Sequence, residues 1–78
     1  MTQNEIDVIN RYTRLMSQTK RIMKDLVDNM SVTNSYENQT SDIDHLAELL
    51  NRYSRYNSLR DSVLTFAKLR EDYAHETH

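Results

Sequence analysis

The 78-residue sequence contains no glycine, no proline and no cysteine. Glycine and proline supply the positive or fixed φ angles that tight turns need, so their absence argues against a fold with many strands. Without cysteine, the chain can form neither a disulfide nor a thiolate zinc site. A domain this small buries little surface, and with those supports excluded we expect it to be stabilised by association with other chains.

Long apolar runs are missing as well. No stretch is apolar and long enough to span a bilayer, and the first ten residues lack the basic and apolar regions of a secretory signal. The 10 Lys and Arg residues nearly balance the 12 Asp and Glu residues, giving a net charge of -2. Overall charge therefore favours neither nucleic acid nor an anionic membrane, and we expect a cytoplasmic protein with no membrane contact.

What the sequence does contain is two long segments in which apolar residues recur at helical spacing. The first is predicted over about residues 3–29, where Thr2 and Glu5 have the spacing of a capping box. A stretch rich in Ser, Thr and Asn, about residues 31–40, is predicted to be a loop. The second helix is predicted over about residues 42–75. The expected fold is all-α, one domain over residues 1–78, arranged as an antiparallel two-helix hairpin.

The apolar residues of the first segment form two adjoining seams. One seam comprises Ile9, Tyr12, Met16, Thr19, Met23, Leu26 and Met30. The other comprises Val8, Tyr12, Leu15, Thr19, Ile22 and Leu26. An apolar stripe of this width is typical of a helix that packs against two neighbours, as in a helix bundle.

The second segment is expected to begin at Ser41, an N-cap residue, with Asp42 and Asp44 near the positive end of the helix dipole. Its apolar stripe comprises Leu46, Leu49, Leu50, Tyr53, Tyr56, Leu59, Val63, Leu64, Phe66, Leu69 and Tyr73. Steps of three recur in this stripe, which predicts a drift around the helix instead of a strict heptad. This helix is also longer than the first by roughly two turns, so its end should project beyond the hairpin.

A two-helix hairpin encloses no interior. The simplest closed arrangement is therefore a homodimer that forms a four-helix bundle. The alternative is a three-helix arrangement in which the second helix is broken near Asn57-Ser58.

A short internal repeat places similar residues on both segments. Residues 9–15, INRYTRL, recur as residues 50–56, LNRYSRY. The candidate ligand- or partner-binding residues within it are Arg11, Tyr12, Arg14, Arg52, Tyr53, Arg55 and Tyr56. In one interpretation the tyrosines belong to the core and the arginine stems cover its border. In the other, the arginines bind phosphate groups of nucleic acid or a nucleotide while a tyrosine stacks on a base.

Charges of one sign are grouped along the chain. Residues 11–24 carry basic charges alone, residues 25–51 carry Asp and Glu but no Lys or Arg, and residues 52–70 are again mainly basic. Folding the chain into a hairpin brings the two basic blocks together and leaves the acidic block at the loop end. This basic band could bind an anionic ligand, or it could meet the acidic tip of an antiparallel second copy.

Near the end of the second segment, the stretch Arg70-Glu71-Asp72-Tyr73-Ala74-His75 separates an arginine from a histidine by four residues. This spacing resembles the active-site motif of HEPN-type ribonucleases. The resemblance implies that the motifs of two subunits meet and that Arg70 and His75 serve metal-independent phosphodiester cleavage.

The function expected from these features is that of a small, non-enzymatic helical interaction or regulatory protein. It would be an inhibitor or adaptor of the phage or plasmid type, acting as a homo-oligomer that binds a host protein. The alternatives are a binder of nucleic acid or nucleotide phosphates through the repeated Arg-Tyr elements, and a minimal HEPN-like ribonuclease. No cofactor and no metal site is expected.

Overall fold

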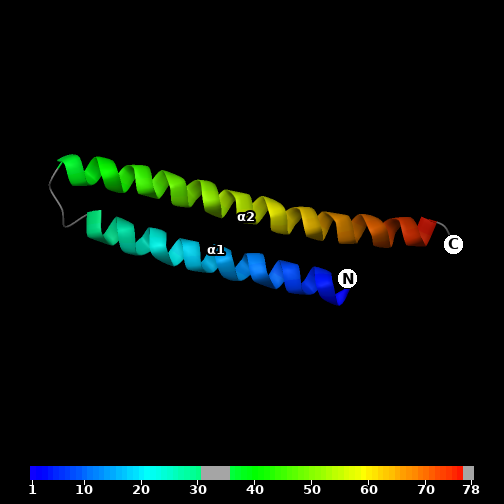
Figure 1. The fold of residues 1–78 in the computed structure, drawn as a ribbon. Coiled ribbons are helices and arrows are strands. Elements are labelled where there is room, and N and C mark those ends of the chain that lie inside the picture. Colours follow the sequence, from blue (N-terminus) through cyan, green and yellow to red (C-terminus); the bar gives the residue numbers. More distant parts are fainter. Residues whose placement is uncertain (31–35, 77–78) are drawn as a thin grey trace.

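The computed structural model describes residues 1–30 and 36–76, and it describes side chains for residues 1–30 and 40–76. Two helices account for nearly all of these residues: α1 is Gln3–Met30 and α2 is Tyr36–Glu76. Figure 1 shows the two helices side by side and antiparallel. The predicted all-α helical hairpin is therefore confirmed.

The first turn of α1 has the predicted capping box. The Glu5 backbone N–H donates to Thr2 Oγ1 at 3.2 Å, and the Thr2 backbone N–H donates to Glu5 Oε1 at 2.8 Å. Each side chain thus satisfies a backbone group that a helix start leaves without an intrahelical partner. The local sequence fixes this end of the hairpin.

The second helix begins earlier than predicted. Residues 36–40 are already helical, so the proposed cap at Ser41 is wrong and Ser41 lies inside α2. Helix growth adds one hydrogen bond for each residue fixed, so a long helix can extend through residues of weak helix propensity. α2 also continues through Asn57-Ser58, so the predicted break and the three-helix alternative are wrong. The remainder of the predicted loop, residues 31–35, lies outside the described residues.

The contact between the helices is a seam with a heptad spacing on both sides. The half-buried and buried residues of α1 include Glu5, Ile9, Tyr12, Met16, Thr19, Met23, Leu26 and Met30. Those of α2 include Asp42, Leu46, Leu49, Tyr53, Tyr56, Arg60, Val63 and Ala67. Steps of three and four alternate throughout both sets, as in a coiled coil. The seam of α2 keeps this spacing by using Asp42, Arg60 and Ala67, which the apolar stripe did not include. Other members of that stripe, among them Leu59 and Phe66, lie off the seam and are exposed.

The core formed by this seam is thin. Among the described residues, the buried ones are Met16, Leu49 and Ala67, together with Thr19, whose Oγ1 donates to the Leu15 carbonyl at 2.8 Å. The molecule measures 65 × 17 × 14 Å, and its radius of gyration is 18.3 Å, against about 12 Å for a compact domain of this length. Its accessible surface is 6301 Å², roughly 1300 Å² above the ~5000 Å² expected of a globular monomer of 9.3 kDa.

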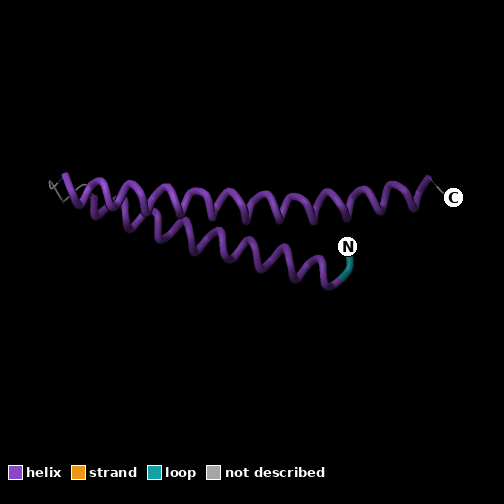
Figure 2. The backbone as a smooth tube through the Cα atoms, turned by 45° about the horizontal axis from the view of Figure 1, so that its top comes forward, coloured by secondary structure: helices purple, strands orange, loops and turns teal. Residues whose placement is uncertain are grey.

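The open end of the hairpin differs from its loop end. In Figure 2, α1 diverges from α2 toward the N-terminus. Figure 1 also shows that α2 continues beyond the start of α1, as its greater length predicted. The open end therefore offers both a widening between the helices and a projecting helical end.

Arg60 places a charged side chain in the middle of the seam. Arg60 Nη2 donates to Asn57 Oδ1 at 3.1 Å, and Arg60 Nε lies 4.0 Å from Asp61 Oδ1. That Nε is buried and makes no hydrogen bond within the described part of the chain. Keeping a charged group in such a position costs desolvation energy that its contacts only partly offset.

We therefore expect Arg60→Leu to raise the free energy of unfolding by about 1 kcal/mol. Urea unfolding followed by circular dichroism at one fixed protein concentration measures the change. Arg14→Leu, at an exposed position of α1, is the matched control and should alter stability by less than about 0.5 kcal/mol. Destabilisation by Arg60→Leu would contradict this account.

Candidate interaction surface

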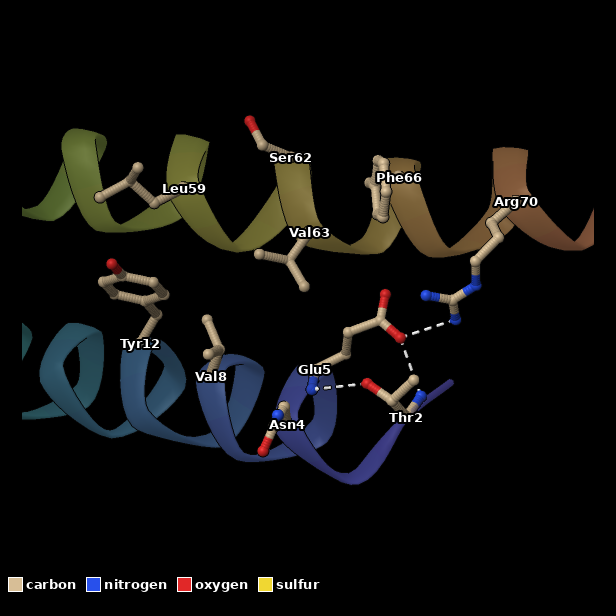
Figure 3. Close-up of a pocket in the computed structure, with 10 residues that line it drawn as sticks. All are labelled: Thr2, Asn4, Glu5, Val8, Tyr12, Leu59, Ser62, Val63, Phe66 and Arg70. Atoms are coloured by element: carbon tan, nitrogen blue, oxygen red, sulfur yellow. Dashed lines mark hydrogen bonds and ion pairs between the residues drawn. The ribbon is translucent and has the colours of Figure 1, made fainter.

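A concave apolar surface lies between the helices near the open end (Figure 3). We call it the apolar hollow; its volume is about 450 Å³. Its lining consists of Thr2, Asn4, Glu5, Val8, Tyr12, Leu59, Ser62, Val63, Phe66 and Arg70. Val63 points from the seam into the hollow, and Val8 approaches it from α1 (Figure 3).

Helical spacing explains why apolar side chains gather there. Leu59 and Phe66 each lie one position away from the seam of α2, on the side of Val8, and seven residues separate them. Residues seven apart lie nearly above one another on a helix. Leu59 is 38% exposed and Phe66 is 62% exposed, so the hairpin leaves much of this apolar surface to solvent.

An ion pair ties the two helices together at the rim of the hollow. Arg70 Nη2 donates to Glu5 Oε1 at 2.6 Å, and the Arg70 guanidinium lies 5.9 Å from the centre of the Phe66 ring. The Met1 amino group lies 3.3 Å from Glu71 Oε1. The Glu5 side chain is 13% exposed, and its Oε2 is buried with no hydrogen-bond partner in the described part of the chain.

These contacts change the acidity of Glu5. The hydrogen bond from Arg70, followed by that from the Thr2 backbone, lowers the pKa of Glu5 from 4.5 to about 2. The unfolded chain therefore takes up a proton at a higher pH than the folded one does. The resulting stabilisation is present above pH 4.5 and is lost as the pH falls toward 2.

We expect Glu5→Gln to make the loss of stability on acidification less steep between about pH 6 and about pH 2, because glutamine does not titrate. The measurement is urea unfolding at several pH values within that range. Arg70→Met removes the main cause of the pKa shift and should flatten the profile in the same way. If all three proteins give equal slopes, the ion pair does not form in solution.

A second concave surface adjoins the apolar hollow and shares Tyr12 and Leu59 with it. We call it the basic hollow; its volume is about 730 Å³. Its lining consists of Arg11, Tyr12, Leu15, Glu48, Asn51, Arg52, Arg55, Tyr56 and Leu59. No ion pair joins any of its three arginines to a carboxylate among the described side chains. The basic hollow therefore combines three guanidinium groups with one carboxylate.

The structure brings together most of the candidate residues from the repeat, but not as equivalent pairs. Tyr12 stacks with Tyr56, with ring centroids 6.1 Å apart and an interplanar angle of 30°. Tyr53, which corresponds to Tyr12 in the repeat, instead lines a different surface with Lys20 and Arg60. Arg14 is exposed and lines neither the apolar nor the basic hollow.

Of the residues that line the apolar hollow, only Tyr12 and Arg70 were among the predicted site residues. The sequence did carry a signal for it, because Leu59 and Phe66, which both line the hollow, stand seven positions apart. Both belong to the predicted apolar stripe, but they stand beside the positions that alternate by three and four and form the seam.

Arg70 and His75, the pair that resembles the HEPN motif, stand five positions apart on α2, or about 140° around the helix axis. Arg70 is engaged by Glu5, and the ribonuclease alternative remains a prediction. No group of three His, Cys, Asp or Glu side chains that could hold a metal ion occurs among the described residues. Over the same residues, neither helix is apolar enough along its length to cross a bilayer.

These observations define an antiparallel helical hairpin with a heptad seam, whose two hollows lie next to each other on one side. Compared with protein-family profiles, curated proteins and solved structures, the chain gives no match.

Proposed function

We propose that this chain is a non-enzymatic helical interaction module that acts as an oligomer and binds another protein as a regulator or adaptor. The observation that carries the proposal is the distribution of exposed apolar residues on α2. Leu59 and Phe66 lie on the side of the two hollows, whereas Leu50 and Leu64 each follow a seam residue and lie on the opposite flank. One helix thus exposes apolar residues on both flanks of its seam.

Apolar residues on two flanks can serve two partners. Exposed large apolar residues beside an already formed seam are typical of an interaction site. One copy can cover the side with the hollows, which leaves the opposite flank of Leu50 and Leu64 for a different protein. Leu50 is 52% exposed and Leu64 is 39% exposed, so both remain accessible in the single hairpin.

Photochemical cross-linking at the opposite flank tests the second partner. Two variants of this chain are compared. In the first, a photoreactive phenylalanine analogue replaces Leu64; in the second, the control, it replaces Thr65, the adjacent exposed residue. We expect a discrete adduct with one heterologous protein from position 64 and none from position 65. Equal labelling from both positions, or none from either, contradicts binding through this flank.

The basic hollow favours a second candidate function, the binding of phosphate groups. Its three arginines come from both helices, and guanidinium groups form paired hydrogen bonds with phosphate. In this function Arg52→Glu with Arg55→Glu weakens binding to a short single-stranded oligonucleotide. Removing the two contacts reduces the slope of log affinity against log salt by about 1.4. The matched control is Lys20→Glu with Lys24→Glu, which alters an exposed basic pair outside the basic hollow.

A further inference from the structure

We propose that the basic hollow of one hairpin receives the C-terminal end of α2 from a second copy of this chain. In this homodimer the two hairpins overlap at their open ends, with their apolar hollows face to face and their α2 helices antiparallel. The proposal rests on the proposed function, because it names the partner that covers the side of the hollows.

The first observation is a second heptad series on α2. It leads from Arg52 to Glu76 by alternating steps of three and four residues, through Leu59, Phe66 and Leu69, and every residue at these positions is exposed. The series carries basic residues at its beginning, apolar residues in its middle and an acidic residue at its end. An exposed heptad series of this kind is a surface for packing another helix.

This series is complementary to itself when two copies run antiparallel. If the two-fold axis passes between Ser62 and Phe66, Leu59 of one copy faces Leu69 of the other. The same register places Arg52 opposite Glu76 and Arg55 opposite Tyr73. At the centre Ser62 faces Phe66, flanked by the apolar pairs of Leu59 and Leu69, and the outer pairs join a guanidinium to a carboxylate or to an aromatic ring.

Charge distribution favours this register over three others. A parallel dimer, or an antiparallel dimer with complete overlap, brings the basic hollows of the two copies together and places like charges in contact. An antiparallel dimer that overlaps at the loop ends sets the basic hollow against acidic residues, but it leaves both apolar hollows uncovered. Overlap at the open ends covers the apolar hollows and brings Asp72 and Glu76 near the arginines.

The available area also suits a second copy. The hairpin exposes 6301 Å², roughly 1300 Å² more than a globular protein of its mass. A specific dimer of standard size removes about 800 Å² from each partner. The excess surface of one hairpin is therefore sufficient for such an interface.

Disulfide cross-linking tests the register directly, because the natural sequence contains no cysteine. Arg52→Cys and Glu76→Cys are combined in one chain, in which the two positions are about 36 Å apart along α2. We expect this double variant to oxidise to a covalent dimer at least about tenfold faster than either single variant. The control combines Glu48→Cys with Glu76→Cys, which shifts one position by about 6 Å and should cross-link more slowly.

Charge exchange tests the contact without cysteine. Arg52→Glu and Glu76→Arg should each raise the dimer dissociation constant by about tenfold, because each places like charges opposite one another in both halves of the dimer. Combining the two changes restores opposite charges and should return the dissociation constant to within about threefold of the unaltered protein. Sedimentation equilibrium gives the dissociation constant of the unaltered protein, the two single variants and the double variant. Circular dichroism checks that each remains helical.

The possible results separate the two proposals. In the first case the unaltered protein is a dimer, but positions 52 and 76 do not cross-link and the double charge exchange does not restore the dissociation constant. This result overturns the register and leaves the proposed oligomer intact. An unaltered protein that remains monomeric at millimolar concentration overturns both the dimer and the proposed oligomer. A monomer that binds an oligonucleotide through Arg52 assigns the basic hollow to phosphate and also overturns the second copy as its occupant.

Discussion

Leu49→Ala is expected to lower the free energy of unfolding by about 3 kcal/mol. Leu49 is 2% exposed, and alanine leaves a cavity in a seam with few other buried side chains. A chain of this length has a total stability of roughly 4–12 kcal/mol. The substitution therefore removes a large share of what keeps the hairpin folded.

Leu50→Ala provides the matched control for this prediction. Leu50 is the next residue of the same helix and is 52% exposed, so helix propensity changes equally while the loss of packing differs. We expect its effect on the free energy of unfolding to stay below about 1 kcal/mol. Thermal and urea unfolding at a fixed protein concentration compare the two variants. Equal losses from both would mean that the seam does not pack as described.

Leu59→Gln should weaken self-association by roughly a hundredfold. The change places a polar side chain at the centre of the surface with the two hollows, once in each copy. Each copy then loses about 1.5 kcal/mol of apolar burial, and two such losses correspond to about two decades in the dissociation constant. Sedimentation equilibrium across a range of concentrations gives the constant.

The control is Leu64→Gln, which makes the same chemical change on the opposite flank of α2. Leu59 is 38% exposed and Leu64 is 39% exposed. The two variants therefore remove similar amounts of exposed apolar surface, but from opposite flanks of α2. Leu64→Gln should leave the dissociation constant unchanged within about twofold. If both leucines matter equally, the hairpin associates through both sides, and our assignment of the hollows to self-association is wrong.

The sequence predicted the helices and the α1 side of the seam because those features depend on local spacing. The alternation of apolar residues in α1 identified seven members of its seam, and the Thr2 and Glu5 spacing identified its cap. The α2 side of the seam was harder to predict. Its helical spacing is maintained by Arg60 and Ala67, which an apolar pattern does not include.

The candidate site was predicted only in part, for a different reason. The repeat at residues 9–15 and 50–56 drew attention to the arginines that line the basic hollow. It did not reveal that Tyr12 stacks with Tyr56, because sequence similarity carries no information about the register between two antiparallel helices. That register depends on contacts across the whole seam, including the pair between Glu5 and Arg70.

The polar residues of the seam have a consequence for how the two helices align. In a seam made only of apolar residues, α1 could slide by one heptad, about 10 Å, along α2 and find similar partners. Such a slide would separate Glu5 from Arg70, whose ion pair joins the two helices. This pair therefore acts against alternative alignments. A hairpin with Arg70→Met should accordingly populate more than one alignment, which would be visible as additional amide resonances.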